Sequence, residues 1–180
     1  MKVSLCFRIL RGADNIHKIG GSGFANWIGN ENEFDGTSNS GFNGVNEGKT
    51  DKSDVTWGRV ELTARGEKIT NMLNVMYVTD AGTTETLTAF GIEGKDIVGA
   101  VIGNVCAVFT TTEEAYSDEF SFTANGSGTL EYFIIGLHKG EWTVKLGDKA
   151  QKTYTLAEEG GMIRFEAEAN CKITVAPDFE

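Results

Sequence analysis

The chain has 180 residues, enough for one domain, or two small ones sharing a boundary, with a real hydrophobic core. Its formal net charge of −10 argues against nucleic acid and anionic membranes as partners of the surface as a whole. No apolar run approaches the ~20 residues that cross a bilayer. With 23 Gly, 11 Phe and one Pro, and no long amphipathic helical pattern, the composition predicts an all-β protein.

The first predicted strand covers Lys2–Leu10 and alternates apolar and polar residues. It follows Met1 directly, so we expect no signal peptide. A first strand without a preceding neighbour also suggests a fragment or a truncated reading frame. Residues 1–18 carry four basic side chains against the single acidic Asp14, which makes this end of the chain basic.

A glycine-rich turn and a long polar segment follow. Gly20-Gly21-Ser22-Gly23 requires backbone angles that most residues avoid. Residues 29–54 are mostly Gly, Asn, Ser and acidic groups, and we interpret them as a long surface loop. Within it, Asn30–Gly36 superficially suggests a calcium loop but lacks the EF-hand spacing. We expect no metal and no cofactor.

Two strands are predicted within Trp57–Asp80, joined by a short polar turn. The first has the alternation of a half-buried strand. The second is apolar on both faces, with Leu73, Val75 and Tyr77 on one side. The other face carries Met72, Met76 and Val78. A strand of this kind needs cover on both sides, so we expect a second layer, a second domain or a partner there.

Beyond Asp80, strand patterns recur every 8–12 residues with turn residues between them. The predicted strands are Thr86–Phe90, Asp96–Ile102, Val105–Thr110, Glu119–Ala124, Thr129–Ile135, Glu141–Leu146, Lys152–Leu156, Met162–Ala167 and Cys171–Ala176. Tight hairpins are predicted at residues 102–105, 125–128 and 146–149. This spacing predicts an antiparallel two-layer β-sandwich.

Several conspicuous side chains are assigned to the core. Tyr77, Tyr132, Tyr154, Trp142 and Val144 all fall on apolar strand faces. Three widely spaced cysteines fit neither a disulfide framework nor a zinc site, so we predict buried free thiols at Cys6, Cys106 and Cys171.

One group of residues is a candidate carbohydrate-contact site. Successive backbone amides of the glycine turn can cradle a carboxylate or sulfate, and basic and aromatic side chains lie nearby in sequence. The group comprises Arg8, Arg11, His17, Lys18, Gly21, Ser22 and Trp27. The alternative is a simple glycine turn between two strands, with Trp27 in the core.

Four motifs in order resemble a known family. They are Ile16–Gly21 with Phe24 and Trp27, then Trp57–Glu61, Leu73–Asp80 and Gly136–Val144. Together they resemble the C-terminal β-region of heparinase II/III-type polysaccharide lyases, which include alginate lyases and heparin-degrading enzymes. The similarity covers nearly all of the chain except residues 29–54.

The resemblance implies a larger parent enzyme with an α/α toroid, a central β-sandwich and a small final β-sandwich. Residues 1–80 would then be trailing strands of the central sandwich, and 81–180 the small final one. In such lyases a Tyr or His removes the uronate C5 proton, and the catalytic groups lie mainly upstream of the matched motifs. We therefore assign no catalytic residue.

Three functions follow from these observations. The first is a non-catalytic domain with a structural, domain-packing role. The second is an accessory module that binds acidic, uronic-acid polysaccharide. The third is part of a lyase that cleaves such polymers by β-elimination when joined to its toroid. The face of Met72, Met76 and Val78 would contact the missing toroid domain or a second copy of the chain.

Overall fold

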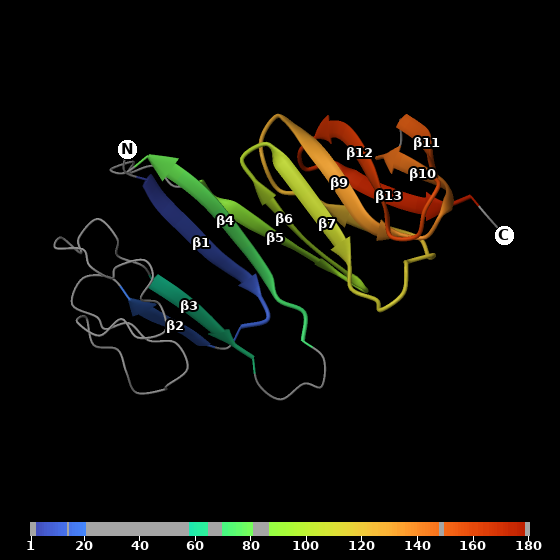
Figure 1. The fold of residues 1–180 in the computed structure, drawn as a ribbon. Coiled ribbons are helices and arrows are strands. Elements are labelled where there is room, and N and C mark those ends of the chain that lie inside the picture. Colours follow the sequence, from blue (N-terminus) through green and yellow to red (C-terminus); the bar gives the residue numbers. More distant parts are fainter. Residues whose placement is uncertain are drawn as a thin grey trace. The chain divides into compact units, whose positions relative to one another are not determined.

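The computed structural model describes residues 3–13, 15–20, 58–64, 70–80, 87–147 and 150–178. They form strands and no helix, as the sequence predicts (Figure 1). The strands are β1 (Val3–Arg11), β2 (Asn15–Gly20), β3 (Gly58–Thr63), β4 (Leu73–Asp80), β5 (Ala89–Gly94), β6 (Ile97–Ile102), β7 (Val105–Thr110), β8 (Phe120–Thr123), β9 (Thr129–Leu137), β10 (Gly140–Leu146), β11 (Ala150–Leu156), β12 (Gly161–Glu168) and β13 (Lys172–Pro177).

The chain divides into two compact units. The first combines Met1–Gly12 with Asn71–Glu180, and the second is Ala13–Thr70. In the second unit the described strands β2 and β3 pair antiparallel, with Asn15 opposite Thr63 and Gly20 opposite Gly58. The predicted loop 29–54 lies between these strands, outside the described residues.

The first unit contains the predicted two-layer sandwich. A five-stranded sheet in the order β12-β9-β7-β6-β5 faces a four-stranded sheet in the order β11-β10-β13-β8 (Figure 1). Neighbouring strands are antiparallel except β7 and β9, which run parallel. After β7 the chain crosses to the four-stranded sheet, where it forms β8, and then returns to the five-stranded sheet as β9. Because the chain reverses once on each crossing, β9 runs in the same direction as β7.

The core lies between these two sheets, where alternating residues of each strand meet. On β12, Ile163, Phe165 and Ala167 are buried and the residues between them are exposed. Trp142 is fully buried, and its indole N–H donates to the carbonyl of His138 at 2.9 Å. Among the described residues, the largest fully buried side chains are Trp142, Tyr132, Ile97, Leu130, Ile134, Leu137, Ile163, Ile173, Val101, Val108, Val144 and Val175.

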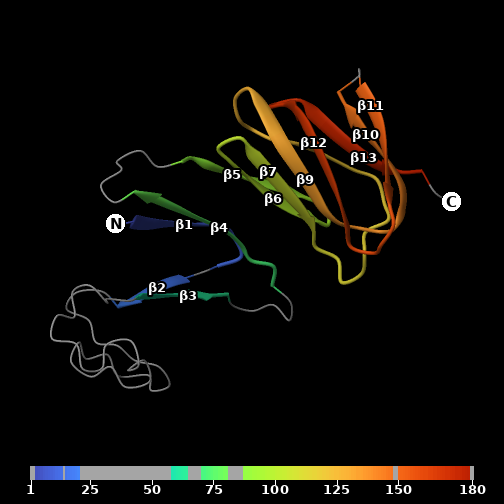
Figure 2. The same ribbon diagram turned by 45° about the horizontal axis from the view of Figure 1, so that its top comes forward.

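A two-stranded ribbon packs on the outer face of the five-stranded sheet. It consists of β1 and β4, which pair antiparallel, and it lies against β5 and β6 (Figure 2). Val98 and Ala100 of β6 are buried without belonging to the inter-sheet core. Gly91 and Ala100, which lie opposite each other on this outer face, are small, and a Cβ added at Gly91 would lie 4.0 Å from Cβ of Leu10. This lets the ribbon approach closely.

Two predicted turns do not join paired strands. The strands predicted within Trp57–Asp80 exist, but β3 pairs with β2 and β4 pairs with β1. Residues 125–128 connect β8 and β9, which belong to different sheets, so the hairpin predicted there is wrong. The hairpins at 102–105 and 146–149 do join paired neighbours. Local turn chemistry predicts a reversal of the chain but not the partner of each strand.

Candidate functional site

The predicted carbohydrate-contact residues are distributed over several parts of the chain. Arg8 and Arg11 are half-buried on β1, opposite Val75 and Leu73 of β4. His17 and Lys18 belong to β2, where only the backbone is described. The glycine turn, with Gly21 and Ser22, and also Trp27, lies outside the described residues. The proposed grouping therefore stays a prediction.

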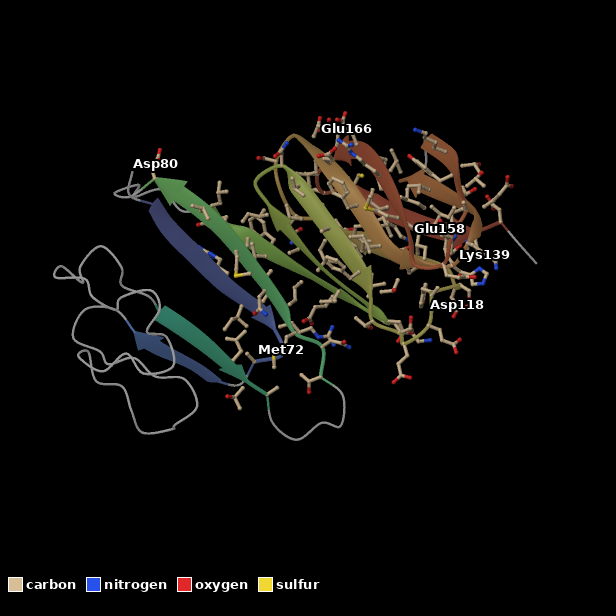
Figure 3. All side chains as sticks on the ribbon, viewed as in Figure 1. Met72, Asp80, Asp118, Lys139, Glu158 and Glu166 are labelled. Atoms are coloured by element: carbon tan, nitrogen blue, oxygen red, sulfur yellow. The ribbon has the colours of Figure 1, made fainter. Side chains whose placement is uncertain are left out.

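The ribbon carries the exposed apolar face that the sequence indicates. Met76 and Val78 expose 64% and 65% of their surface, and Met72 exposes 42%. Met72 and Asp80 lie at opposite ends of this stretch (Figure 3). The register sets Phe7 opposite Met76 and Leu5 opposite Val78, which are apolar residues as well. Large exposed apolar groups in a contiguous arrangement indicate an interaction surface.

A second apolar area lies on the part of the five-stranded sheet that the ribbon does not occupy. Phe109 of β7 and Met162 of β12 are exposed, and Phe133 and Ile135 of β9 are half-buried. The register connects them, because Ile135 lies opposite Phe109 on one side and Met162 on the other. Arg164 covers the Phe133 ring at 5.6 Å and pairs with the Glu131 carboxylate.

A small charged cluster occupies one end of the sandwich. Nε2 of His138 lies 3.3 Å from the Glu159 carboxylate, and the Lys139 ammonium lies 3.5 Å from it. Lys139 and Glu158 mark this end in Figure 3. The pKa of the Glu159 carboxyl is lowered in the folded chain. Desolvation by burial raises this pKa, but the hydrogen bond from the Lys139 N–H and the charges of His138 and Lys139 lower it by more. A carboxylate held ionised in this way is suited to an ion pair rather than to proton transfer.

The buried titratable groups are held in their neutral forms. Burial raises the pKa of the Tyr132 hydroxyl, with smaller contributions from Cys106, Cys171 and Glu168. Burial also raises the pKa of Tyr116, as do the nearby Asp118 and Asp96 carboxylates. A phenol with a raised pKa stays protonated at neutral pH, so neither tyrosine is suited to act as a general base there.

The predicted core residues are confirmed for several side chains. Tyr132, Trp142 and Val144 are buried, and Cys106 is a buried free thiol. Cys171 is also free but only half-buried, because it directly precedes β13 at the edge of the core. Tyr77 and Tyr154 are half-buried. The side chain of Cys6 lies outside the described part.

The described residues also bear on two other classes of site. Across these parts of the chain, no cluster of three or more His, Cys, Asp or Glu side chains is placed to hold a metal ion. The same residues include no helix of the length and apolarity needed to span a bilayer.

The sandwich described above is the part of the chain that comparison with known families recognises. Residues 91–177 match the heparinase II C-terminal domain. The resemblance to the C-terminal region of heparinase II/III-type lyases is thus confirmed for these residues, just under half of the chain. The matched residues, called here the heparinase II-like module, begin within β5 and end with β13, so they contain both sheets. No curated protein matches the chain.

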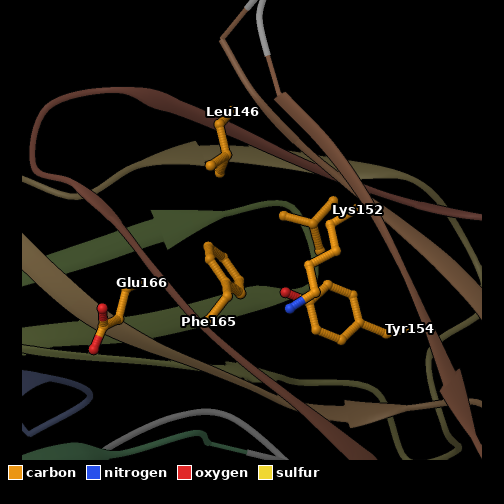
Figure 4. Close-up of a pocket in the computed structure, with 6 residues that line it drawn as sticks. Leu146, Lys152, Tyr154, Phe165 and Glu166 are labelled. Atoms are coloured by element: carbon orange, nitrogen blue, oxygen red, sulfur yellow. The ribbon is translucent and has the colours of Figure 1, made fainter.

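Sequence reasoning missed two surface features of the heparinase II-like module. One is the apolar area around Phe109 and Ile135, whose signal was present in the alternate residues of strands β7 and β9. The other is a pocket at the open edge of the sandwich, lined by residues of β10, β11 and β12 that include Lys152, Tyr154 and Phe165 (Figure 4). No local pattern predicts that pocket, because its residues come from three strands.

Proposed function

We propose that this chain is a non-catalytic β-sandwich domain of a heparinase II/III-like polysaccharide lyase, with a structural role in packing against the rest of the enzyme. The match of residues 91–177 to the heparinase II C-terminal domain supports the parent family. The observation that carries the packing role is the open apolar face of the ribbon, with Met76 and Val78 about two-thirds exposed.

The structural role is consistent with how the ribbon and the module are joined. The described ribbon lies outside the matched residues, yet it buries Val98 and Ala100 of the module. Its inner face is therefore used within the chain, and its outer face is available to another domain. A layer covered on one side and apolar on the other is typical of sheets that pack between two neighbours.

An activity assay tests the non-catalytic part of the proposal. The purified 180-residue chain is incubated with alginate, heparin and hyaluronan, and ultraviolet absorbance from unsaturated uronate is followed. We expect no growth of absorbance, while an active heparinase II/III-type lyase on the same polymers gives the positive signal. Sustained growth with the purified chain would show that these residues contain a complete catalytic site and would refute the proposal.

A further inference from the structure

The connection between β8 and β9 contains the dipeptide Asn125-Gly126, a sequence that reacts with itself when the chain is free to move. The backbone nitrogen of the glycine attacks the Cγ atom of the asparagine, because glycine has no side chain to hinder the approach. A five-membered succinimide forms as the bond from Cγ to the amide nitrogen breaks, and ammonia leaves with the proton of the glycine nitrogen. Water then opens the ring to aspartate or isoaspartate. The Asn125 side chain is exposed, so water reaches it.

The side chain of Asn170 engages both backbone groups of Gly126. The Gly126 N–H donates to Oδ1 of Asn170 at 3.3 Å, and Nδ2 of Asn170 donates to the Gly126 carbonyl at 2.9 Å. The first of these hydrogen bonds occupies the nitrogen that would attack Asn125. The second holds the chain on the other side of Gly126. The attacking nitrogen therefore cannot turn onto Cγ of Asn125 until these bonds break.

Asn170 is itself fixed by the turn between β12 and β13. Its φ of 65° lies in the left-handed region, which asparagine adopts more readily than most residues. Its own N–H donates to the carbonyl of Ala124 at 2.9 Å, and the N–H of Ala169 donates to the carbonyl of Gly128 at 2.8 Å. The turn thus holds the connection on both sides of the reactive dipeptide.

Packing also leaves Gly126 little room to move. A Cβ added at this position would lie 3.4 Å from Cδ1 of Leu130 and 3.5 Å from Cβ of Ala169. Leu130 and Ala124 are fully buried in the inter-sheet core, so the backbone around the dipeptide rests on a fixed surface. Closing the succinimide ring requires rotation of Asn125 relative to Gly126. The hydrogen bonds and the packing together oppose that rotation in the folded chain.

We propose that Asn125 is a deamidation site and that the Asn170 side chain slows the reaction in the folded chain. When the turn at Asn170 opens, the Gly126 nitrogen is released and attacks Asn125. The product carries a new carboxylate in the connection between the two sheets, and isoaspartate also lengthens the backbone there by one atom. The reaction belongs to the sandwich itself, so it does not depend on the proposed packing role.

Mass spectrometry of proteolytic fragments from the incubated full chain measures aspartate and isoaspartate at position 125. A capped synthetic peptide of residues 123–129 gives the rate without the fold. The test variant is Asn170→Gly, which removes both side-chain hydrogen bonds and still adopts a positive φ. Because two hydrogen bonds must break first, we expect the wild-type chain to react about tenfold more slowly than the peptide. Asn170→Gly should approach the peptide rate.

The matched control is Asp96→Gly, because Asp96 also has a positive φ, 59°, and lies in the turn between β5 and β6. It should react at the wild-type rate, and thermal unfolding shows whether both glycine variants are folded. Asn125→Gln closes a ring far more slowly and should give no product at this position. The proposal is wrong if the wild-type chain reacts as fast as the peptide, which needs no variant to measure. It is also wrong if Asn170→Gly keeps the wild-type rate, or if Asp96→Gly accelerates the reaction equally.

Discussion

At the scale of single residues, Gly136 shows how one position shapes a sheet. It is an extra residue in β9 where the register with β12 shifts, and its φ is 96°. Such a bulge bends a strand. Its carbonyl accepts from the Tyr116 N–H at 2.9 Å and from the Thr110 hydroxyl at 3.2 Å. The bulge therefore ties the end of β9 to the loop before β8.

Replacing Gly136 by alanine is expected to destabilise the fold by roughly 3 kcal/mol or more, because the backbone angle is strained and the new Cβ would collide with the Thr110 hydroxyl. Gly103 is the matched control, since its φ is 57° and a Cβ there meets nothing within 4 Å. We expect Gly103→Ala to cost about 1 kcal/mol. Urea unfolding measures both, and equal losses would contradict this account.

Cys106 gives a residue-scale prediction about pH. Burial raises the pKa of its thiol from 9.0 to about 12. Between these values the unfolded chain binds fewer protons than the folded chain, so stability falls as pH rises. We expect part of this loss to disappear in Cys106→Ala, as measured by urea unfolding at pH 8 and pH 10. An unchanged pH dependence in that variant would show that Cys106 does not contribute.

At the scale of elements, the docking of the β1–β4 ribbon depends on small residues beneath it. Ala100 is buried on the outer face of β6, and Ala107 lies opposite it on β7 but is only half-buried. Aspartate at position 100 would put a carboxylate under the ribbon, where desolvation of a charge is costly. The same change at position 107 leaves the carboxylate partly in water.

We therefore expect Ala100→Asp to release the ribbon and Ala107→Asp to leave it in place. Limited trypsin digestion measures this through cleavage after Arg8 and Arg11, which are half-buried on β1. Cleavage should be faster only in Ala100→Asp, while the thermal unfolding of the sandwich stays native-like in both variants. Equal cleavage rates would indicate that the ribbon does not depend on this contact.

How far the sequence predicts the fold also differs by element. Period-two patterns predict strands such as β7 and β12 to within one residue, because each has one buried and one exposed face. These patterns do not predict which strand pairs with which. The paired residues of β3 and β4 lie at least 38 residues upstream, as Gly20 does from Gly58. The pocket that includes Lys152, Tyr154 and Phe165 could not be predicted from the sequence for the same reason, since its lining residues belong to strands of two different sheets.

At the scale of the whole molecule, the exposed ribbon face predicts self-association. Met76 and Val78 are adjacent in alternation on β4 and largely exposed, and burying such side chains contributes about 1.5–3 kcal/mol each. In a solution of the purified chain, a second copy can cover these side chains. We expect light scattering during size exclusion to show dimers or larger species at micromolar concentration.

The double variant Met76→Lys with Val78→Lys is expected to be monomeric, because two ammonium groups on each copy would repel and resist desolvation. Met162→Lys is the control, since Met162 is half-exposed on β12 at the other apolar area. It should leave the assembly intact if the ribbon face is the contact. If Met162→Lys dissociates the assembly and the double variant does not, the copies contact each other through the apolar area around Phe109 instead. A monomeric wild-type chain would refute self-association.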